Sequence, residues 1–177
     1  MKKIIIIYGV IVGAIVITTM IIGYAMATPD MKTGSVAFGY LTMLVAMSLI
    51  FAGIKKYRDK ELGGVIKFWP ALKVGLGISA VAGLIYVIGW EINLALTDYA
   101  FIENYTQGII EAKKKAGLSG NELETLVASM EKMKTSYGNP LYRMPLTFAE
   151  IFPVGILVSL LSAAILRNPK ILPARTL

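Results

Sequence analysis

Three ionisable side chains lie within long apolar stretches of the sequence, where they could do chemistry inside a membrane. Glu91 follows Trp90 near the end of one stretch, and Lys73 lies near its start. Glu150 lies in a later stretch, shortly before Pro153, and proline kinks a helix. An ionisable group is costly in a bilayer, so each is a candidate functional residue. Either carboxylate could bind a proton or a cation. The candidate intramembrane polar site therefore comprises Glu91, Glu150 and Lys73.

Each of these residues also has a purely structural interpretation. Glu91 beside Trp90 is typical of a carboxylate at the membrane interface. Glu150 lies about 140° around a helix from Gly155, so it points away from a face of small residues. Lys73 can extend its stem to a lipid phosphate. The functional alternative is the hypothesis that Glu91 and Glu150 face one another across a polar pocket.

The composition excludes most catalytic machinery. The 177 residues include no cysteine and no histidine. Disulfides, zinc-thiolate sites, iron–sulfur clusters and histidine-based triads are therefore excluded. The sequence predicts a protein that is not an enzyme and has no cofactor.

The balance of apolar and charged residues indicates a membrane protein. Hydrophobic residues make up 56% of the chain and charged residues 16%, whereas soluble domains carry about 25% charged residues. The net charge of +7 is assigned to contacts with lipid head groups and not to nucleic acid.

Four segments are apolar enough to cross a bilayer, which takes about 20 helical residues. They are residues 4–27, 35–54, 69–96 and 145–166. The first also resembles a signal peptide that ends in Ala25-Met26-Ala27, but the apolar part of a signal peptide is only about 7–15 residues long. A retained helix is favoured, and cleavage would leave three spans.

The basic residues predict the orientation of the chain, because short loops rich in lysine and arginine stay in the cytoplasm. We expect both termini in the cytoplasm of a bacterial cell, the spans in its inner membrane, and the segments 28–34 and 97–142 outside. The lysines of segment 97–142 run against this orientation. The basic residues assigned to the cytoplasmic side are Lys2, Lys3, Lys55, Lys56, Arg58, Lys60, Lys67, Arg167, Lys170 and Arg175.

The segment 99–137 is predicted to form an amphipathic helical hairpin. Apolar residues recur at helical spacing before and after Gly117, which can end a helix. Ser119 and Glu122 have the spacing of a capping box for the second helix. The predicted fold is therefore a single all-α membrane domain over 1–177, with four transmembrane helices and an extracytoplasmic hairpin between the third and fourth. The apolar positions are Phe101, Tyr105, Ile109 and Ala112, then Leu123, Leu126, Val127, Met130 and Met133.

Small residues spaced four apart predict where the helices approach closely. Packing within one chain is favoured over a dimer interface. The three series are Gly9 and Gly13; Gly75, Ser79 and Gly83; and Gly155, Ser159 and Ala163.

Several stretches together form a family marker. They are Gly39-Tyr40-Leu41-Thr42-Met43, Gly53-Ile54-Lys55-Lys56-Tyr57-Arg58-Asp59, Gly63-Gly64 with Ile66 and Phe68, and Gly75-Leu76-Gly77-Ile78. Through them nearly the whole chain resembles a bacterial membrane family classed as a domain of unknown function, number four-one-nine-nine. The resemblance implies a small protein with several spans and carries over no catalytic residues.

The leading hypothesis for the function is an accessory or scaffold module that is not an enzyme. It predicts a protein partner at the hairpin or at the basic loop 55–67. The alternative is a small oligomeric transporter or ion-coupled carrier that uses Glu91 and Glu150. A membrane enzyme ranks last. Expected partners are membrane lipids and either another membrane protein or further copies of the chain, with no nucleic acid.

Overall fold

The computed structural model describes residues 1–26 and 36–174, apart from the side chains of 24–26 and 36–38. Within these residues every regular element is an α-helix, with no strand. The predicted segment 28–34, the ends of the first two predicted spans at 27 and 35, and Arg175 lie outside the described residues. The helices are α1 (Lys2–Met26), α2 (Val36–Met47), α3 (Leu49–Glu61), α4 (Phe68–Leu96), α5 (Ala100–Lys115), α6 (Gly120–Tyr137) and α7 (Pro140–Leu166).

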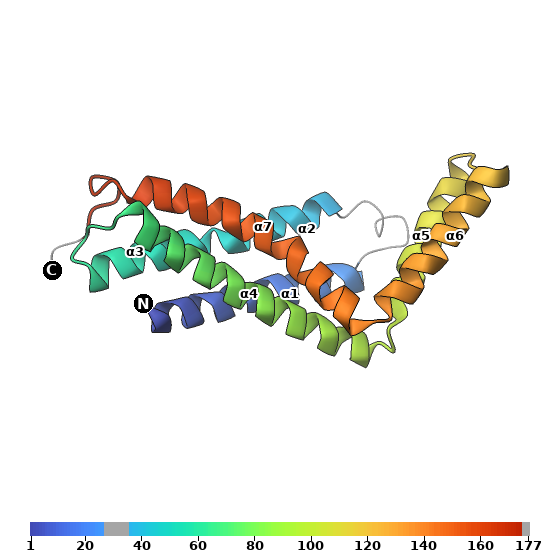
Figure 1. Cartoon of the computed structure of the whole chain (residues 1–177), viewed down its shortest axis with the longest axis horizontal. Coiled ribbons are helices and arrows are strands. Elements are labelled where there is room, and N and C mark those ends of the chain that lie inside the picture. Colours follow the sequence, from blue (N-terminus) through green and yellow to red (C-terminus); the bar gives the residue numbers. More distant parts are fainter. Residues whose placement is uncertain (27–35, 175–177) are drawn as a thin grey trace.

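Four helical segments among the described residues are long and apolar enough to cross a membrane. They are Lys2–Gly23, Gly39–Glu61, Phe68–Leu96 and Pro140–Leu166. They run side by side along the long axis of the molecule (Figure 1). The α5–α6 hairpin lies beyond one end of this bundle, and the N-terminus and the tail 167–174 lie at the other. We call these the hairpin end and the tail end.

Two helices extend beyond the predicted spans. The second span was expected to end at residue 54, but α3 continues to Glu61, so part of the basic loop is helical. The fourth span was expected to begin at 145, but α7 begins at Pro140. Pro140 stands at the first position of the helix, where its missing N–H costs nothing, and Asn139 caps it by accepting from the Leu141 N–H at 3.0 Å.

The small residues pack within the chain, as predicted. The most extensive helix contacts are those of α4 with α1 and with α7. A Cβ added at Gly13 would lie 2.7 Å from the Ile85 Cβ, and one at Gly155 would lie 2.6 Å from the Ser79 Cβ. The hydroxyls of Ser79 and Ser159 lie 3.2 Å apart at the α4–α7 contact. Glycine and serine thus let these helix backbones approach closely.

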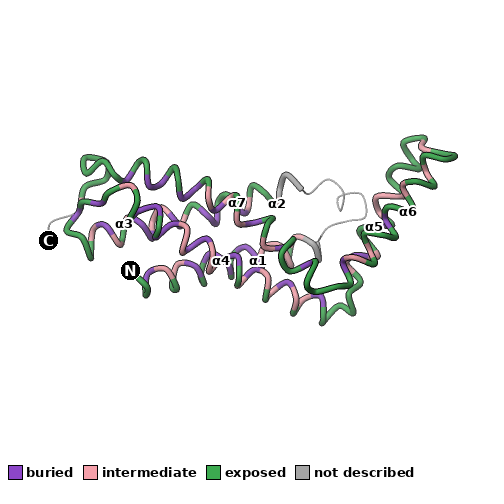
Figure 2. Tube along the Cα trace, viewed as in Figure 1, coloured by how far each residue is buried: buried purple, intermediate pink, exposed green. Residues whose placement is uncertain are grey.

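Buried residues are frequent in the bundle and rare in the hairpin. Buried positions recur along α4 and its neighbours, whereas α5 and α6 are largely exposed (Figure 2). The core extends continuously from Ile54 and Leu166, near the tail end, to Trp90 and Leu94, near the hairpin end. The bundle can therefore position side chains rigidly at both of its ends.

The predicted helical hairpin is present, with two differences in detail. Gly117 ends α5 with a φ of +92°, as expected for a glycine stop. Ser119 precedes α6 but makes no side-chain capping bond, so the predicted capping box is wrong. The buried positions of α5 are Ile102 and Thr106, while Tyr105 is 44% exposed. Phe101 of the predicted face does pack against Trp90 and the core, so the prediction differs from the structure mainly at Tyr105.

Candidate functional site

The hairpin end of the bundle holds a polar cluster that joins α4 to the start of α7. Glu91 lies on α4, less than two turns before its last residue, Leu96. Arg143 lies in the first turn of α7, which the cap at Asn139 and the proline at position 140 fix in place. The packing of α4 against α7 along the bundle brings Glu91 and Arg143 to the same position along its axis.

Glu91 and Arg143 form a bidentate ion pair. The Arg143 Nε donates to Glu91 Oε1 at 2.7 Å, and Nη2 donates to Oε2 at 2.6 Å. The Nη1 group donates to the carbonyls of Tyr137 and Gly138, at 3.1 and 3.2 Å. Arg143 is only 2% exposed. Its planar donors match the carboxylate, so the pair fixes both position and orientation.

Aromatic side chains surround this ion pair and connect it to the hairpin. The Trp90 Nε1 donates to the Tyr137 hydroxyl at 2.8 Å. The Phe101 ring packs edge-on against Trp90, with 4.8 Å between ring centroids. Burial raises the pKa of Tyr137, and the hydrogen bond from Trp90 partly opposes this rise. These contacts join α4, α5 and α6 in one rigid base for the hairpin.

The connection from α4 to α5 is a tight turn with an unusual backbone. Asp98 and Tyr99 have φ values of +48° and +56°, a region that costs a residue with a side chain about 1 kcal/mol or more. The Tyr99 ring lies 5.0 Å from the Arg143 guanidinium carbon, and the Tyr99 N–H donates to the Leu94 carbonyl at 2.9 Å. The cation–π contact helps to hold this strained turn.

Glu150 lies apart from this cluster. The residue is exposed on α7, and its Oε2 lies 3.5 Å from the hydroxyl of Tyr86, which is fully buried. That hydroxyl also donates to the Met20 sulfur at 2.6 Å. Glu91 and Glu150 thus have different partners, and no direct contact between them is found in the described part of the chain.

Lys73 does not belong to either group. It is exposed on α4, 18 residues before Glu91, which is about 27 Å along the helix. Its position suits the structural interpretation, in which the ammonium group extends to the membrane surface. Of the three predicted site residues, Glu91 alone joins the polar cluster at the hairpin end.

A second buried arginine lies at the tail end. Arg58 on α3 is fully buried, and its Nε donates to Asp59 at 2.7 Å. Its Nη1 donates to the Ile171 carbonyl at 3.0 Å, and its Nη2 donates to the Leu172 carbonyl. Lys55 pairs with the same Asp59 carboxylate. Arg58 therefore fixes the tail 167–174 against α3, whereas the sequence indicated a topology determinant first and a lipid or partner contact second.

The sequence did not reveal Arg143 as a site residue, because it lies outside the predicted fourth span. A usable signal was present: Arg143 is the one arginine between Trp69 and Leu166, and an acid near the end of a span needs a basic partner. Among residues 1–26 and 36–174, no group of three or more acidic side chains is placed to hold a metal ion. The cluster around Arg143 has the chemistry of a structural clamp.

Comparisons with known proteins identify a family but no activity. A family model described as "Protein of unknown function (DUF4199)" matches residues 7–168. No curated protein and no solved structure matches the chain.

Proposed function

Since the chain belongs to the family DUF4199, whose description assigns no activity, we propose its function from the geometry: it is an accessory or scaffold module and not an enzyme. Its four spans lie in a bacterial inner membrane, with both termini in the cytoplasm. The α5–α6 hairpin is presented outside as a fixed arm that binds another membrane protein. The Glu91–Arg143 pair is the observation that carries this proposal.

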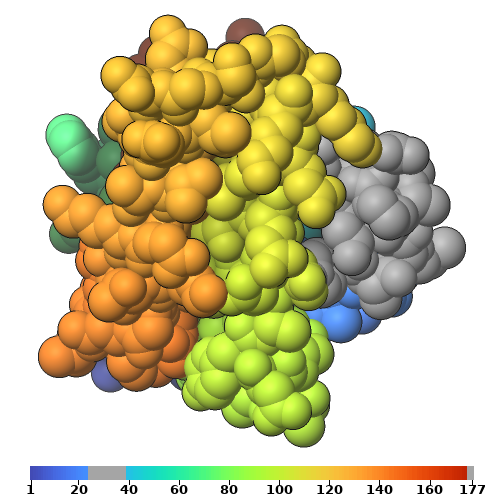
Figure 3. All heavy atoms as spheres, turned by 90° about the vertical axis from the view of Figure 1, so that its right-hand side faces the viewer, coloured from blue at the N-terminus to red at the C-terminus, as the bar shows by residue number. Residues whose placement is uncertain are grey.

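That pair matters because it sets the direction of the hairpin. Arg143 binds Glu91 of the bundle and the carbonyls of Tyr137 and Gly138 at the end of α6. Figure 3 looks onto the hairpin end, where α5 and α6 lie side by side and rise from the ends of α4 and α7. An arm fixed before binding loses less conformational freedom when a partner docks.

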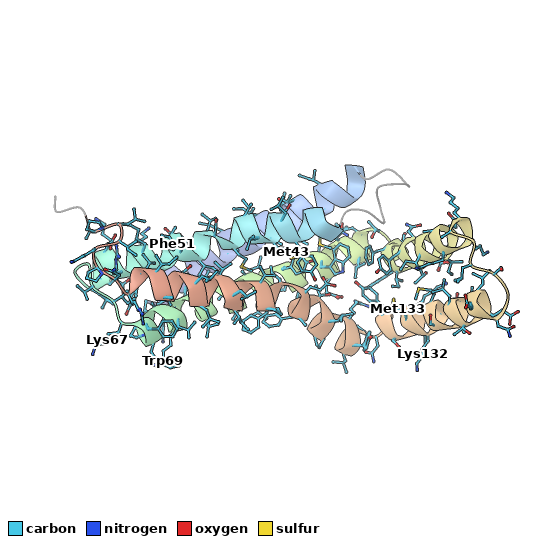
Figure 4. All side chains as sticks on the ribbon, turned by 90° about the horizontal axis from the view of Figure 1, so that it is seen from above. Met43, Phe51, Lys67, Trp69, Lys132 and Met133 are labelled. Atoms are coloured by element: carbon cyan, nitrogen blue, oxygen red, sulfur yellow. The ribbon has the colours of Figure 1, made fainter. Side chains whose placement is uncertain are left out.

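The hairpin also offers apolar contact surface. Tyr105, Val127 and Met133 are 44%, 36% and 38% exposed. Met133 and its neighbour Lys132 lie on α6, near the end of that helix that leads into α7 (Figure 4). The hairpin residues 100–137 carry five lysines and five glutamates, so charge does not favour a strongly acidic or basic partner. A partner with a mixed apolar and polar surface suits this arm.

The carrier alternative is less well supported. It requires Glu91 and Glu150 as free carboxylates that bind and release an ion. Glu91 is bound by Arg143 through both oxygens, and an arginine does not lose its proton in the relevant pH range. Glu150 is then the remaining carboxylate for such a mechanism.

A crosslinking experiment tests the proposal. Ser129→Cys places the chain's one thiol on exposed α6, since the protein has no cysteine of its own. Crosslinking in native membranes should capture one partner protein, distinct from this chain, in every repeat of the experiment. The control adds Arg143→Gln, which should reduce that adduct because the arm loses its fixed direction. Crosslinks to the same chain alone would favour a homo-oligomer and contradict the accessory role.

The orientation needs its own test. A membrane-impermeant thiol reagent applied to intact cells should label Ser129→Cys and leave Lys60→Cys unlabelled, because these exposed positions lie at opposite ends of the molecule. Labelling of Lys60→Cys alone would place the hairpin in the cytoplasm.

A further inference from the structure

The outward face of α7 carries one charged group in an otherwise apolar line. Leu146, Leu157 and Leu161 are 43%, 61% and 62% exposed, as expected for side chains that face lipid. Glu150 and Pro153 are exposed between them. The spacing of four, three, four and four residues keeps this line on one side of the helix. A carboxylate on such a face is costly unless something covers it.

Around Glu150, hydrogen-bond acceptors outnumber donors. The described chain gives its carboxylate one hydrogen bond, from the Tyr86 hydroxyl at 3.5 Å, and the same hydroxyl has a shorter contact with the Met20 sulfur, at 2.6 Å. No lysine or arginine of the described chain pairs with Glu150. Pro153 has no N–H, so the carbonyl of Ala149, four residues earlier, lacks its helical donor. A carboxylate with one long hydrogen bond, next in sequence to a residue whose carbonyl lacks its helical donor, suits a cationic donor.

The depth of Glu150 decides which donors can reach it. The midpoint of α7 is residue 153, so Glu150 lies about 4.5 Å from it along the helix. The edge of a hydrocarbon core about 30 Å thick is then about 10 Å or more away. A lipid head group stays at that edge, whereas a side chain on a neighbouring transmembrane helix lies at the right depth.

We propose that the face of α7 around Glu150 docks a transmembrane helix of a partner protein that carries a lysine or arginine near the middle of its span. The cationic side chain donates to the Glu150 carboxylate and to the Ala149 carbonyl, and the leucines on either side pack against the helix. Each charge removes the cost of the other in lipid. The inference rests on the proposed role in binding membrane proteins, but it needs neither the hairpin nor the hairpin's partner.

The test uses the full chain in phosphatidylcholine vesicles with synthetic transmembrane peptides. Fluorescent leucine–alanine helices carry lysine, leucine or glutamate at their central position, and energy transfer reports their association with the labelled protein. The lysine peptide should associate about tenfold more tightly than the leucine peptide. Glu150→Gln should remove this preference, and Glu150→Lys should transfer it to the glutamate peptide. Glu124→Gln, on the exposed surface of α6, is the matched control and should retain it.

Two results would overturn the inference. One is equal association of the lysine and leucine peptides, as expected if Glu150 only holds a proton. The other is a lysine preference that survives Glu150→Gln in protein whose circular dichroism shows an intact fold. Neither result affects the crosslinking of Ser129→Cys, so the docking face and the hairpin arm can fail separately.

Discussion

Arg58 and Arg143 are buried at opposite ends of the bundle, and each donates to two backbone carbonyls and to one carboxylate. They differ in what else binds the carboxylate. Asp59 is shared by Arg58 and Lys55, whereas Glu91 pairs with Arg143 alone among the described residues. The tail end therefore has a spare cation and the hairpin end does not.

The two arginines also connect different segments of the chain. Arg58 reaches carbonyls 113 and 114 residues away, so it ties the tail to α3. Arg143 takes its carbonyls from 5 and 6 residues away and its carboxylate from 52 residues away. It therefore fixes the junction of α6 and α7 onto α4. Loss of Arg58 should free a terminal segment, and loss of Arg143 should free the whole hairpin.

The largest effect is expected from Arg143→Ala. It leaves Glu91 without a cation at a site where the carboxylate side chain is only 17% exposed. Removing one partner of a buried pair is strongly destabilising, and we expect a loss of about 3 kcal/mol in the free energy of unfolding. Unfolding in mixed detergent micelles measures it.

The double variant Glu91→Gln with Arg143→Gln is the control for this prediction. It removes both charges, so it should cost clearly less than Arg143→Ala. Equal losses in the two variants would mean that the carboxylate left alone is not what destabilises the protein.

A smaller and more local effect is expected from Arg58→Ala. Asp59 keeps Lys55, so the main loss is the two hydrogen bonds to the tail, worth about 1–2 kcal/mol. Hydrogen exchange should increase in residues 168–172 and stay unchanged in the hairpin. If Arg58→Ala loosened the hairpin as much as the tail, the two ends would not be independent.

Trp90→Phe should weaken the base of the hairpin without freeing it. The substitution removes the Nε1 donor to Tyr137 but keeps an aromatic ring beside Phe101. We expect a loss of about 1 kcal/mol in the free energy of unfolding. Tyr137→Phe breaks the same bond from the other side, and the double variant should cost little more than either single one.

The smallest effect is expected from Lys134→Ala, on the exposed surface of the hairpin. The hydrogen bond from Lys134 lowers the pKa of Glu103. A lowered folded-state pKa stabilises the fold above the ordinary pKa of the group, and this contribution is lost as the pH falls through the lowered value. The Lys134 and Glu103 side chains are 36% and 42% exposed, so solvent and salt should screen the pair. Wild type and variant should have the same melting temperature at neutral pH, and a clear difference there would contradict this ranking.

The parts of the fold that were predictable depend on local signals. Apolar stretches, the glycine at 117 and the spacing of small residues revealed the four candidate spans, the hairpin and the close packing of α4 with α1 and α7. The pairing of Glu91 with Arg143 was not predictable in this way, because it depends on how α4 and α7 align across 52 residues. The helix α7 begins before the predicted span for a related reason: Tyr142 and Arg143 look polar in sequence, although Arg143 is buried in the structure.

The two arginines also set an order of events during biosynthesis. Glu91 and Arg58 leave the ribosome before α7, and each waits for a partner in α7 or in the tail that follows it. A nascent chain that stops short of α7 therefore carries an acid without its cation at one end of the bundle. At the other end it carries an arginine that keeps Asp59 but lacks the tail carbonyls. Both sets of contacts become possible only once α7 and the tail have been made, so the two ends of the bundle are completed last.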